Sequence, residues 1–306
     1  MKRFIKHIVA FIPFALIFYC IGICVFGQLM PSYLKPNLKS SRDSGGFTLT
    51  RLQEVKTVSD IDILFVGSSH TYHGFDTRIF KEAGLTTFNL GTSAQTPLQT
   101  KFLLERYLDN VRPKEIIFQV SPFIFAIKGV ASTVDILSND IVDASSVRLA
   151  LKVNDINVYN ALIYAAFEDI TRKKITFKEK PTLGKFTYIS GGYVETNTTS
   201  YQSNQPIITD FEFNTIQLEA FADMIALVEN REIRYHLVYV PITKPLYTSI
   251  SKHTDFESIM STYGSYYNFN KTMSLDTIYF YDRHHLNKKG VTVFNDKVIE
   301  KLSLSK

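Results

Sequence analysis

Two residue types are almost missing from this sequence. It has no tryptophan, and its two cysteines, Cys20 and Cys24, lie together in an apolar segment near the N-terminus. The rest of the chain can therefore form neither a disulfide bond nor a metal site built from thiolates. A concentrated patch of positive charge is also missing, because the net charge of +5 comes from scattered lysines and arginines. Proteins that follow a nucleic-acid backbone usually gather their basic residues on one face, so we expect no nucleic-acid partner.

Metal-binding patterns are missing as well. His70 and His73 lie close together, and His284 and His285 are adjacent, but no His-x3-His spacing or carboxylate-rich cluster accompanies them. We therefore expect no metal ion and no cofactor. The composition, with 45% hydrophobic and 21% charged residues, is typical of a chain that folds around a core.

One long apolar run stands near the N-terminus. Residues 8–27 carry no charge, and about 20 residues of helix cross the roughly 30 Å hydrocarbon core of a bilayer. We expect a transmembrane helix over residues 8–30, preceded by a short cytoplasmic N-terminus (1–7). A cleaved signal peptide is the main alternative, but its apolar region is usually shorter and ends in small residues.

The charges beside this run suggest its orientation. Three basic residues precede the run, which favours a cytoplasmic N-terminus, and three follow it, which makes the bias small. They are Lys2, Arg3 and Lys6, then Lys35, Lys39 and Arg42. We expect a single-pass protein of the cell membrane with an extracytoplasmic domain.

The rest of the chain alternates strand and helix patterns after a linker expected over residues 31–58, rich in Pro, Gly and Ser. Alternation of this kind predicts a three-layer α/β/α domain over residues 59–306 with a mainly parallel five-stranded sheet. The expected strands are the apolar, β-branched or aromatic runs at 61–67, 86–90, 115–120, 235–240 and 277–281, and the expected helices lie at 98–108, 158–170, 213–228 and 287–302.

Residues 126–210 interrupt this alternation and form an expected insertion. The insertion contains the helical pattern at 158–170 and then a long polar stretch rich in Gly, Ser, Thr, Asn and Tyr. Tyr188, Tyr193 and Tyr201 could stack on sugar rings; the simpler interpretation is a surface excursion without a ligand.

Two short blocks carry the candidate chemistry. The first expected strand ends in Gly67-Ser68-Ser69, where a serine at a helix N-terminus can serve as a nucleophile or simply cap the helix. Far along the chain, Asp282 and His285 are three residues apart before the last helix, so the carboxylate can hold the imidazole. Helix capping by Asp282 or Asn287 is the alternative there. Because ligands of open parallel sheets bind beyond the carboxyl ends of the strands, we expect the two blocks to meet at that edge.

The order of the blocks resembles that of the SGNH or GDSL hydrolase superfamily. The matching features are Gly-x-Ser after the first strand, Asn-x-Gly after the second, and Asp-x-x-His before the last helix, over about residues 60–305. The resemblance implies the flavodoxin-like arrangement of that family. It also implies that Ser69 is the nucleophile and that His285, held by Asp282, is the base.

The second and third blocks depart from the family pattern. In Asn89-Leu90-Gly91-Thr92-Ser93-Ala94 the oxyanion glycine of the family falls at Ala94, whose backbone N–H can still serve if its backbone geometry permits. The usual Gly-x-Asn-Asp is absent, and Ser121 follows the third strand instead. Ser69, Asn89, Gly91, Ala94 and Ser121 are the expected oxyanion and substrate residues.

These departures look like the membrane-anchored branch that includes the D-alanyl-lipoteichoic acid protein DltD. That likeness implies a serine esterase or O-acyltransferase that acts on a cell-envelope polysaccharide or polymer, beside a membrane-bound O-acyltransferase. The altered blocks leave a second hypothesis open, in which the chain is a non-catalytic binding component of a polysaccharide modification or export complex.

Overall fold

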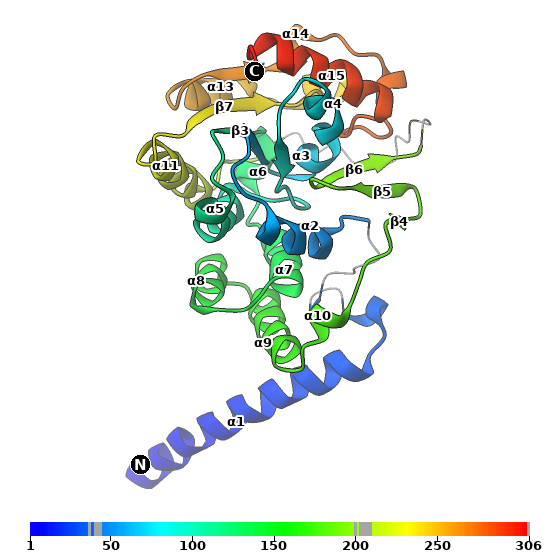
Figure 1. Cartoon of the computed structure of the whole chain (residues 1–306). Coiled ribbons are helices and arrows are strands. Elements are labelled where there is room, and N and C mark those ends of the chain that lie inside the picture. The colour runs from blue at the N-terminus through cyan, green and yellow to red at the C-terminus, as the bar shows by residue number, and fades with distance from the viewer. Residues whose placement is uncertain (36–37, 40–44, 199–200, 202–209, 305–306) are drawn as a thin grey trace. The chain divides into compact units, whose positions relative to one another are not determined.

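The computed structural model describes residues 1–35, 38–39, 45–198, 201 and 210–304. The chain packs as two compact units. A helical unit comprises Met1–Ser41 and Thr133–Phe177, and a sheet unit comprises Arg42–Ser132 and Lys178–Lys306. The elements of each unit are labelled in Figure 1.

The helical unit contains α1 (Lys2–Leu29), η1 (Ser32–Leu34), most of α7 (Val130–Asn139), α8 (Ala144–Val153), α9 (Ile156–Ile170) and α10 (Lys173–Thr176). In the sheet unit the order is α2 (Thr48–Glu54), η2 (Val55–Thr57), β1 (Ile63–Val66), α3 (Ser69–Gly74), α4 (Thr77–Glu82), β2 (Thr87–Asn89), α5 (Pro97–Val111), β3 (Glu115–Gln119), α6 (Pro122–Ala126), β4 (Thr182–Leu183), β5 (Phe186–Ile189), β6 (Tyr193–Thr196), α11 (Thr215–Glu229), β7 (Arg234–Tyr239), α12 (Lys244–Ser249), α13 (His253–Ser261), β8 (Tyr266–Asn268), α14 (Phe269–Thr272), η3 (Thr277–Tyr279) and α15 (Lys288–Lys301).

A five-stranded parallel sheet forms the centre of the sheet unit. Its strand order is β2-β1-β3-β7-β8, and each neighbouring pair is parallel. The expected α/β class, the number of strands and the first four strands are therefore confirmed. All four helices expected from periodicity are present as α5, α9, α11 and α15.

The expected fifth strand at 277–281 is wrong. This segment forms η3 and a single antiparallel bridge between Phe280 and Leu286. Its carbonyl groups bind Asn287, whose side chain donates to Ile278 O and whose backbone N–H donates to Tyr279 O. Those groups are no longer available to a neighbouring strand. The fifth strand is β8, which pairs in parallel with β7.

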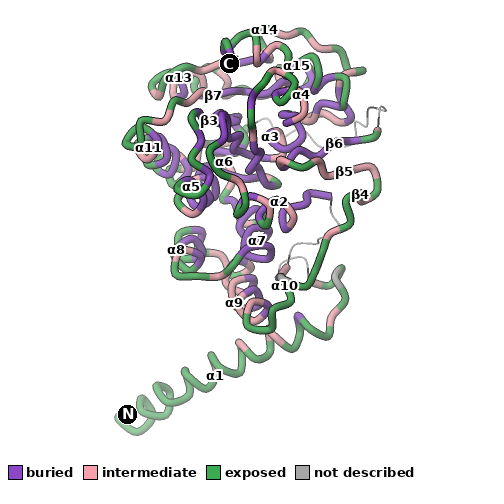
Figure 2. Tube along the Cα trace, in the orientation of Figure 1, coloured by how far each residue is buried: buried purple, intermediate pink, exposed green. Residues whose placement is uncertain are grey.

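Residues of the central strands alternate between the two faces of the sheet. Ile63 and Phe65 of β1 belong to a core cluster with residues of α4 and α15, as do Ile117 of β3 and Val238 of β7. On the other face, Phe118 packs edge-on against Phe221 of α11. Because side chains alternate along a strand, helices cover both faces and the strands are buried (Figure 2).

Part of the expected linker is folded. Residues 48–54 form α2, and Leu49, Leu52 and Val55 are buried in the sheet unit. The segment FTLTRLQEV has the apolar spacing of a helix, and the Gly- and Ser-rich composition belongs to the residues before it. Residues 36–37 and 40–44 of the same expected linker lie outside the described part of the chain.

The expected insertion supplies α7 to α10 of the helical unit and a three-stranded antiparallel sheet, β4-β5-β6. Tyr193 is only 1% exposed, and the Tyr188 hydroxyl donates to Glu54. Tyr201 packs against the sheet core. Tyr193 is therefore a core residue and not a platform for a sugar ring. Residues 199–200 and 202–209 of the polar stretch lie outside the described residues.

The first helix is exposed along most of its length within the structure (Figure 2). By length and composition α1 is apolar enough to cross a membrane, a property that it shares with N-terminal signal sequences.

Candidate active site

The loop after β1 places Ser69 at the start of α3. Gly67 has a φ of 142°, which favours glycine. A Cβ at this position would lie 2.6 Å from Thr71 Oγ1 and 2.8 Å from the Gln119 backbone oxygen. Glycine therefore allows the chain to turn sharply from the buried strand into the helix that carries Ser69.

The two serines of the first block have different environments. Ser68 is the N-cap of α3, and its hydroxyl accepts from His70 N and donates to Gln119 Oε1. The Ser68 backbone N–H donates to the same Gln119 oxygen at 2.9 Å. Because Ser68 takes the capping role, the Ser69 hydroxyl is free to point elsewhere.

Ser69, His285 and Asp282 lie in hydrogen-bond contact. Ser69 Oγ is 2.8 Å from His285 Nε2. His285 Nδ1 is 3.0 and 2.9 Å from the two oxygens of Asp282. A carboxylate only accepts, so Nδ1 carries the ring proton and Nε2 accepts from the serine hydroxyl. The structure thus brings together two blocks that are more than 200 residues apart in the sequence.

Asp282 both orders its own turn and binds the imidazole. Its Oδ1 accepts from the backbone N–H groups of His284 and His285, each at 2.8 Å. Burial alone would raise the pKa of this carboxyl, but the hydrogen bonds from the His285 ring and from the two N–H groups hold the pKa well below its usual value. Asp282 is therefore ionised at neutral pH and fixes the ring orientation.

The surrounding loop holds this turn over the carboxyl end of the sheet. Asn287 caps α15 by accepting from Gly290 N, as one sequence alternative anticipated. The turn itself is closed by the bond from Tyr281 N to His285 O. Thr243, in the loop after β7, donates from its backbone and its hydroxyl to Arg283 O. Asp282 and His285 are thus fixed by the loop and not by a preceding strand.

Two backbone N–H groups expected at the site have no acceptor within the described part of the chain. Among the described residues, no hydrogen bond uses the N–H of Ser69, the first residue of α3, or that of Ala94. Ala94 has a φ of 49°, which is allowed for a residue with a Cβ at some cost. These are the two groups expected to receive an oxyanion.

Asn89 and Gly91 pack against the loop that carries Ser69. The Asn89 side chain donates to Thr71 O at 2.7 Å and accepts from Gly91 N at 3.2 Å, and it is fully buried. A Cβ on Gly91 would lie 2.8 Å from Thr71 Cβ and 2.9 Å from Ser68 O. Both expected site residues therefore pack against the turn that carries Ser69.

Ser121 lies at the carboxyl end of β3, and its buried hydroxyl has no hydrogen-bond partner in the described part of the chain. No hydrogen bond joins this hydroxyl to Ser69, Asp282 or His285 in that part of the chain. Gln119, two residues earlier, instead reaches the first block through Ser68. A glutamine in the otherwise apolar run EIIFQV was the sequence signal for this contact, because a buried amide needs partners.

Three further imidazoles surround His285. The rings of His70 and His73 lie 5.1 and 5.4 Å from the His285 ring, and Tyr281 stacks on its other side at 5.4 Å. Burial and the His285 ring hold the pKa of His70 well below its usual value. Burial lowers the pKa of His73 to about 3 and that of His284 to about 4. At neutral pH these neighbours are uncharged, so they place no fixed positive charge beside His285.

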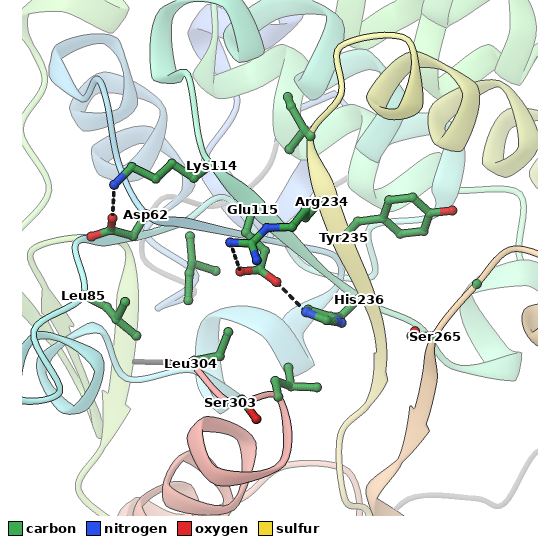
Figure 3. Close-up of a pocket in the computed structure, with 14 residues that line it drawn as sticks. Asp62, Leu85, Lys114, Glu115, Arg234, Tyr235, His236, Ser265, Ser303 and Leu304 are labelled. Carbon is green, nitrogen blue, oxygen red and sulfur yellow. Dashed lines mark hydrogen bonds and ion pairs between the residues drawn. The ribbon is translucent and has the colours of Figure 1, made fainter. Parts of the chain in front are cut away.

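A pocket of about 610 Å³ lies at the opposite edge of the sheet, at the amino ends of β1, β3 and β7 (Figure 3). Its charged side chains pair with one another: Lys114 with Asp62 at 2.8 Å, and Arg234 and His236 with Glu115. It contains no residue of the expected site. Because ligands of open parallel sheets bind at the carboxyl edge, the candidate active site is the one at Ser69.

The fold and these contacts define an α/β protein with a Ser-His-Asp triad geometry at the carboxyl edge of a parallel sheet. No family model matches the chain. No curated protein matches it either.

Solved structures show a distant similarity. A putative acylhydrolase from Bacteroides fragilis NCTC 9343 is 11% identical, with a TM-score of 0.42, over 87% of this chain and 98% of that chain. A GDSL-like lipase from Bacteroides thetaiotaomicron VPI-5482 is 12% identical, with a TM-score of 0.42, over 86% of this chain and 100% of that chain. A gut microbial diltiazem-metabolizing enzyme is 11% identical, with a TM-score of 0.28, over 81% of this chain and 49% of that chain. Similarities this distant assign neither a family nor an activity.

Proposed function

We propose that this chain is a serine acyl-transfer enzyme that works through an acyl group on Ser69. The observation that carries the proposal is the unbroken line of contacts from Ser69 Oγ to His285 and on to Asp282, at 2.8 and 2.9 Å. A serine hydroxyl is a weak nucleophile until a base removes its proton, and this geometry supplies the base and the group that orients it.

The proposed mechanism has two steps. His285 Nε2 takes the hydroxyl proton as Ser69 Oγ attacks an ester or thioester carbonyl, and the Ser69 and Ala94 N–H groups receive the oxyanion. The leaving alcohol or thiol departs with the proton from His285, which leaves an acyl-serine. Water or a sugar hydroxyl then gives its proton to His285 and attacks the acyl carbon. As the bond from the acyl carbon to Ser69 Oγ breaks, His285 returns that proton to Oγ and the free serine is restored.

The setting of the site favours acyl transfer at a cell envelope. If α1 spans the membrane, the sheet unit is anchored to the bilayer, where lipid-linked donors and envelope polymers are close at hand. The motif order resembles the SGNH hydrolases and their membrane-anchored branch, which supports an O-acyltransferase or acylesterase of an envelope glycan, with a membrane-bound O-acyltransferase as partner. We place the sheet unit outside the cytoplasm on the charge bias of the N-terminus.

A non-catalytic role is the second candidate, because one observation favours it. The usual Gly-x-Asn-Asp of the third block is absent, and the hydroxyl of Ser121, which follows the third strand, has no hydrogen-bond partner among the described residues. Loss of one oxyanion donor typically costs about 100-fold to 1000-fold in rate. An accessory binding component would tolerate that loss.

The neighbouring serines provide the test. Ser69→Ala removes the proposed nucleophile, whereas Ser68→Ala removes only a cap and a hydrogen bond, at about 1 kcal/mol of stability. We expect the wild-type chain and Ser68→Ala to become labelled by a fluorophosphonate and to hydrolyse p-nitrophenyl acetate, and Ser69→Ala to do neither. Equal labelling of both variants, or none in the wild-type chain, would contradict the acyl-enzyme.

Transfer and hydrolysis are separated by their products. The wild-type chain is given an acetyl donor with an unacetylated glycan, and then an acetylated glycan alone. Acetylated glycan in the first reaction supports the transferase, and free acetate alone in both supports an esterase.

A further inference from the structure

Helix α8 of the helical unit has an exposed face of unusual composition. Val147 and Leu151 of α8 are 43% and 60% exposed, and they are one helical turn apart. Arg148 and Lys152 stand next to them on the same exposed side. The opposite side of α8, with Leu149, Ala150 and Val153 among others, is buried. The exposed face of α8 therefore carries a row of apolar residues beside a row of cations.

The ends of the same segment are apolar and exposed too. Ile141, just before α8, is 56% exposed, and Ile156, the first residue of α9, is 59% exposed. Single exposed apolar residues are normal on soluble proteins. Four of them lie within sixteen consecutive positions, with two cations on α8 and two carboxylates, Asp143 and Asp155, that cap α8 and α9. An exposed helix face with apolar residues beside cations is typical of a surface that contacts something apolar and anionic.

Contacts inside the helical unit place this segment beside α1. The Tyr19 hydroxyl donates to Asn160 Oδ1 of α9 at 2.5 Å. Further along both helices, Tyr164 donates to Gly27 O at 2.8 Å and accepts from Gln28. Tyr19 lies about two turns, or roughly 12 Å of helix, before Gly27. The first half of α9 therefore lies beside a part of α1 that belongs to its long apolar run (Figure 1).

Packing then connects α1 to α8. α9 follows α8 after a two-residue turn, and it contacts both α8 and α1, so it links the two helices within this unit. Two residues join the end of α8 to the start of α9, and Asn160 in the first half of α9 contacts Tyr19 in the apolar run, so the end of α8 is tied to a segment that lies beside this run.

We propose that the exposed face of α8, formed by Val147, Arg148, Leu151 and Lys152, lies on the surface of an anionic lipid bilayer beside α1. Val147 and Leu151 enter the boundary between headgroups and acyl chains. Arg148 and Lys152 extend toward lipid phosphates, as long basic side chains do at such boundaries. The inference requires that α1 spans the membrane, and it is independent of the chemistry at Ser69.

The absence of tryptophan allows a direct test. Leu151→Trp in the full-length chain gives the protein one tryptophan at the proposed contact. Phe18→Trp, 70% exposed in the middle of α1, reports on the span. Ile278→Trp, 65% exposed, and Ile216→Trp, 41% exposed, are matched controls in the sheet unit. Each variant is reconstituted in phosphatidylcholine and phosphatidylglycerol vesicles with and without brominated acyl chains.

We expect brominated lipid to quench the tryptophan at 151 about twofold or more above both controls, and to quench the tryptophan at 18 most strongly. Adding Arg148→Gln and Lys152→Gln should reduce quenching at 151 in vesicles with phosphatidylglycerol and leave it unchanged in pure phosphatidylcholine.

Quenching at 151 no greater than in the controls overturns the proposal, and Val147→Trp repeats the measurement if Leu151→Trp does not fold. If the tryptophan at 18 is quenched and that at 151 is not, the span survives and the α8 contact fails. If neither is quenched, both fail. Hydrolysis of p-nitrophenyl acetate by the same variants shows separately whether the proposed function stands.

Discussion

Asp282 shows how one side chain can serve both of the roles considered for it from sequence. Its carboxylate accepts from two backbone N–H groups, as a capping residue does, and from His285 Nδ1, as a triad carboxylate does. The two roles reinforce each other, because the backbone bonds fix the carboxylate that fixes the ring.

Replacing Asp282 by asparagine should therefore remove activity without disrupting the turn. The Asn amide oxygen can still accept from the two backbone N–H groups. Unlike a carboxylate, however, an amide does not require a proton on His285 Nδ1. The ring proton can then lie on Nε2, which presents a proton to Ser69 and can no longer accept one from it. We expect kcat for an ester substrate to fall about 10,000-fold. A fall of less than about tenfold, measured by stopped-flow or end-point hydrolysis, would show that this carboxylate does not orient the base.

The low pKa of Asp282 also predicts a pH dependence of stability. The pKa is lower in the folded chain than in the unfolded one, so ionised Asp282 stabilises the fold above the unfolded value of about 3.9, and this contribution is lost as the pH falls through the folded pKa. The difference in urea midpoint between wild-type and Asp282→Asn chains in detergent should be largest at neutral pH and shrink below about pH 4. A constant difference from pH 7 to pH 3 would contradict it.

The sequence located Ser69, Asp282 and His285, because short blocks with defined spacing carry them. It did not show which serine caps α3, since the two are adjacent at the start of the helix. In the structure the Ser68 hydroxyl accepts from His70 N, and the Ser69 hydroxyl contacts His285. Ser121 lies at the end of β3 as expected, and its buried hydroxyl has no hydrogen-bond partner among the described residues, so its role in the site stays a prediction. Contacts between distant side chains are decided by packing, which local pattern does not contain.

At the scale of elements, Gln119 links β3 to the start of α3. Gln119→Leu would leave the buried Ser68 N–H and hydroxyl without their acceptor, at about 1 to 3 kcal/mol of stability. Because Ser69 is the next residue, we expect kcat to fall about 10-fold to 100-fold with little change in KM. Gln119→Glu keeps an acceptor oxygen and should recover part of kcat. Loss of stability with unchanged kcat would limit Gln119 to a structural role.

Strand prediction succeeded for the first four strands, including the edge strand β2, and failed only for β8 at the other edge of the five-stranded sheet. β1 and β3 are continuous apolar runs, which periodicity identifies. β8, Tyr266–Asn268, was not identified, whereas 277–281 has the composition of a strand but its carbonyl groups accept from Asn287. Composition shows what a segment prefers, and the competition for hydrogen-bond partners decides what it forms.

The division of the chain into two compact units is not evident from the sequence. The helical unit combines the N-terminal segment with residues 133–177 of the expected insertion. These residues interrupt the α/β pattern in the sequence, but in the structure they pack with the N-terminal helix. Such long-range pairing has no local signature, although the apolar pattern of α9 was evident.

The orientation of the whole chain can be decided by experiment. The three basic residues before the apolar run favour a cytoplasmic N-terminus, and the three that follow it make this bias small. Alkaline phosphatase fused to the C-terminus in a bacterial host should be active, and the chain should remain in the pellet after alkaline carbonate extraction with residues 1–30 still present by mass spectrometry. Cleavage before Ser32 would identify α1 as a signal sequence. Because the bias is small, changing Lys2, Arg3 and Lys6 to Gln should leave only the positive charges after the run and lower the phosphatase activity severalfold, whereas changing Lys35 and Lys39 to Gln should not.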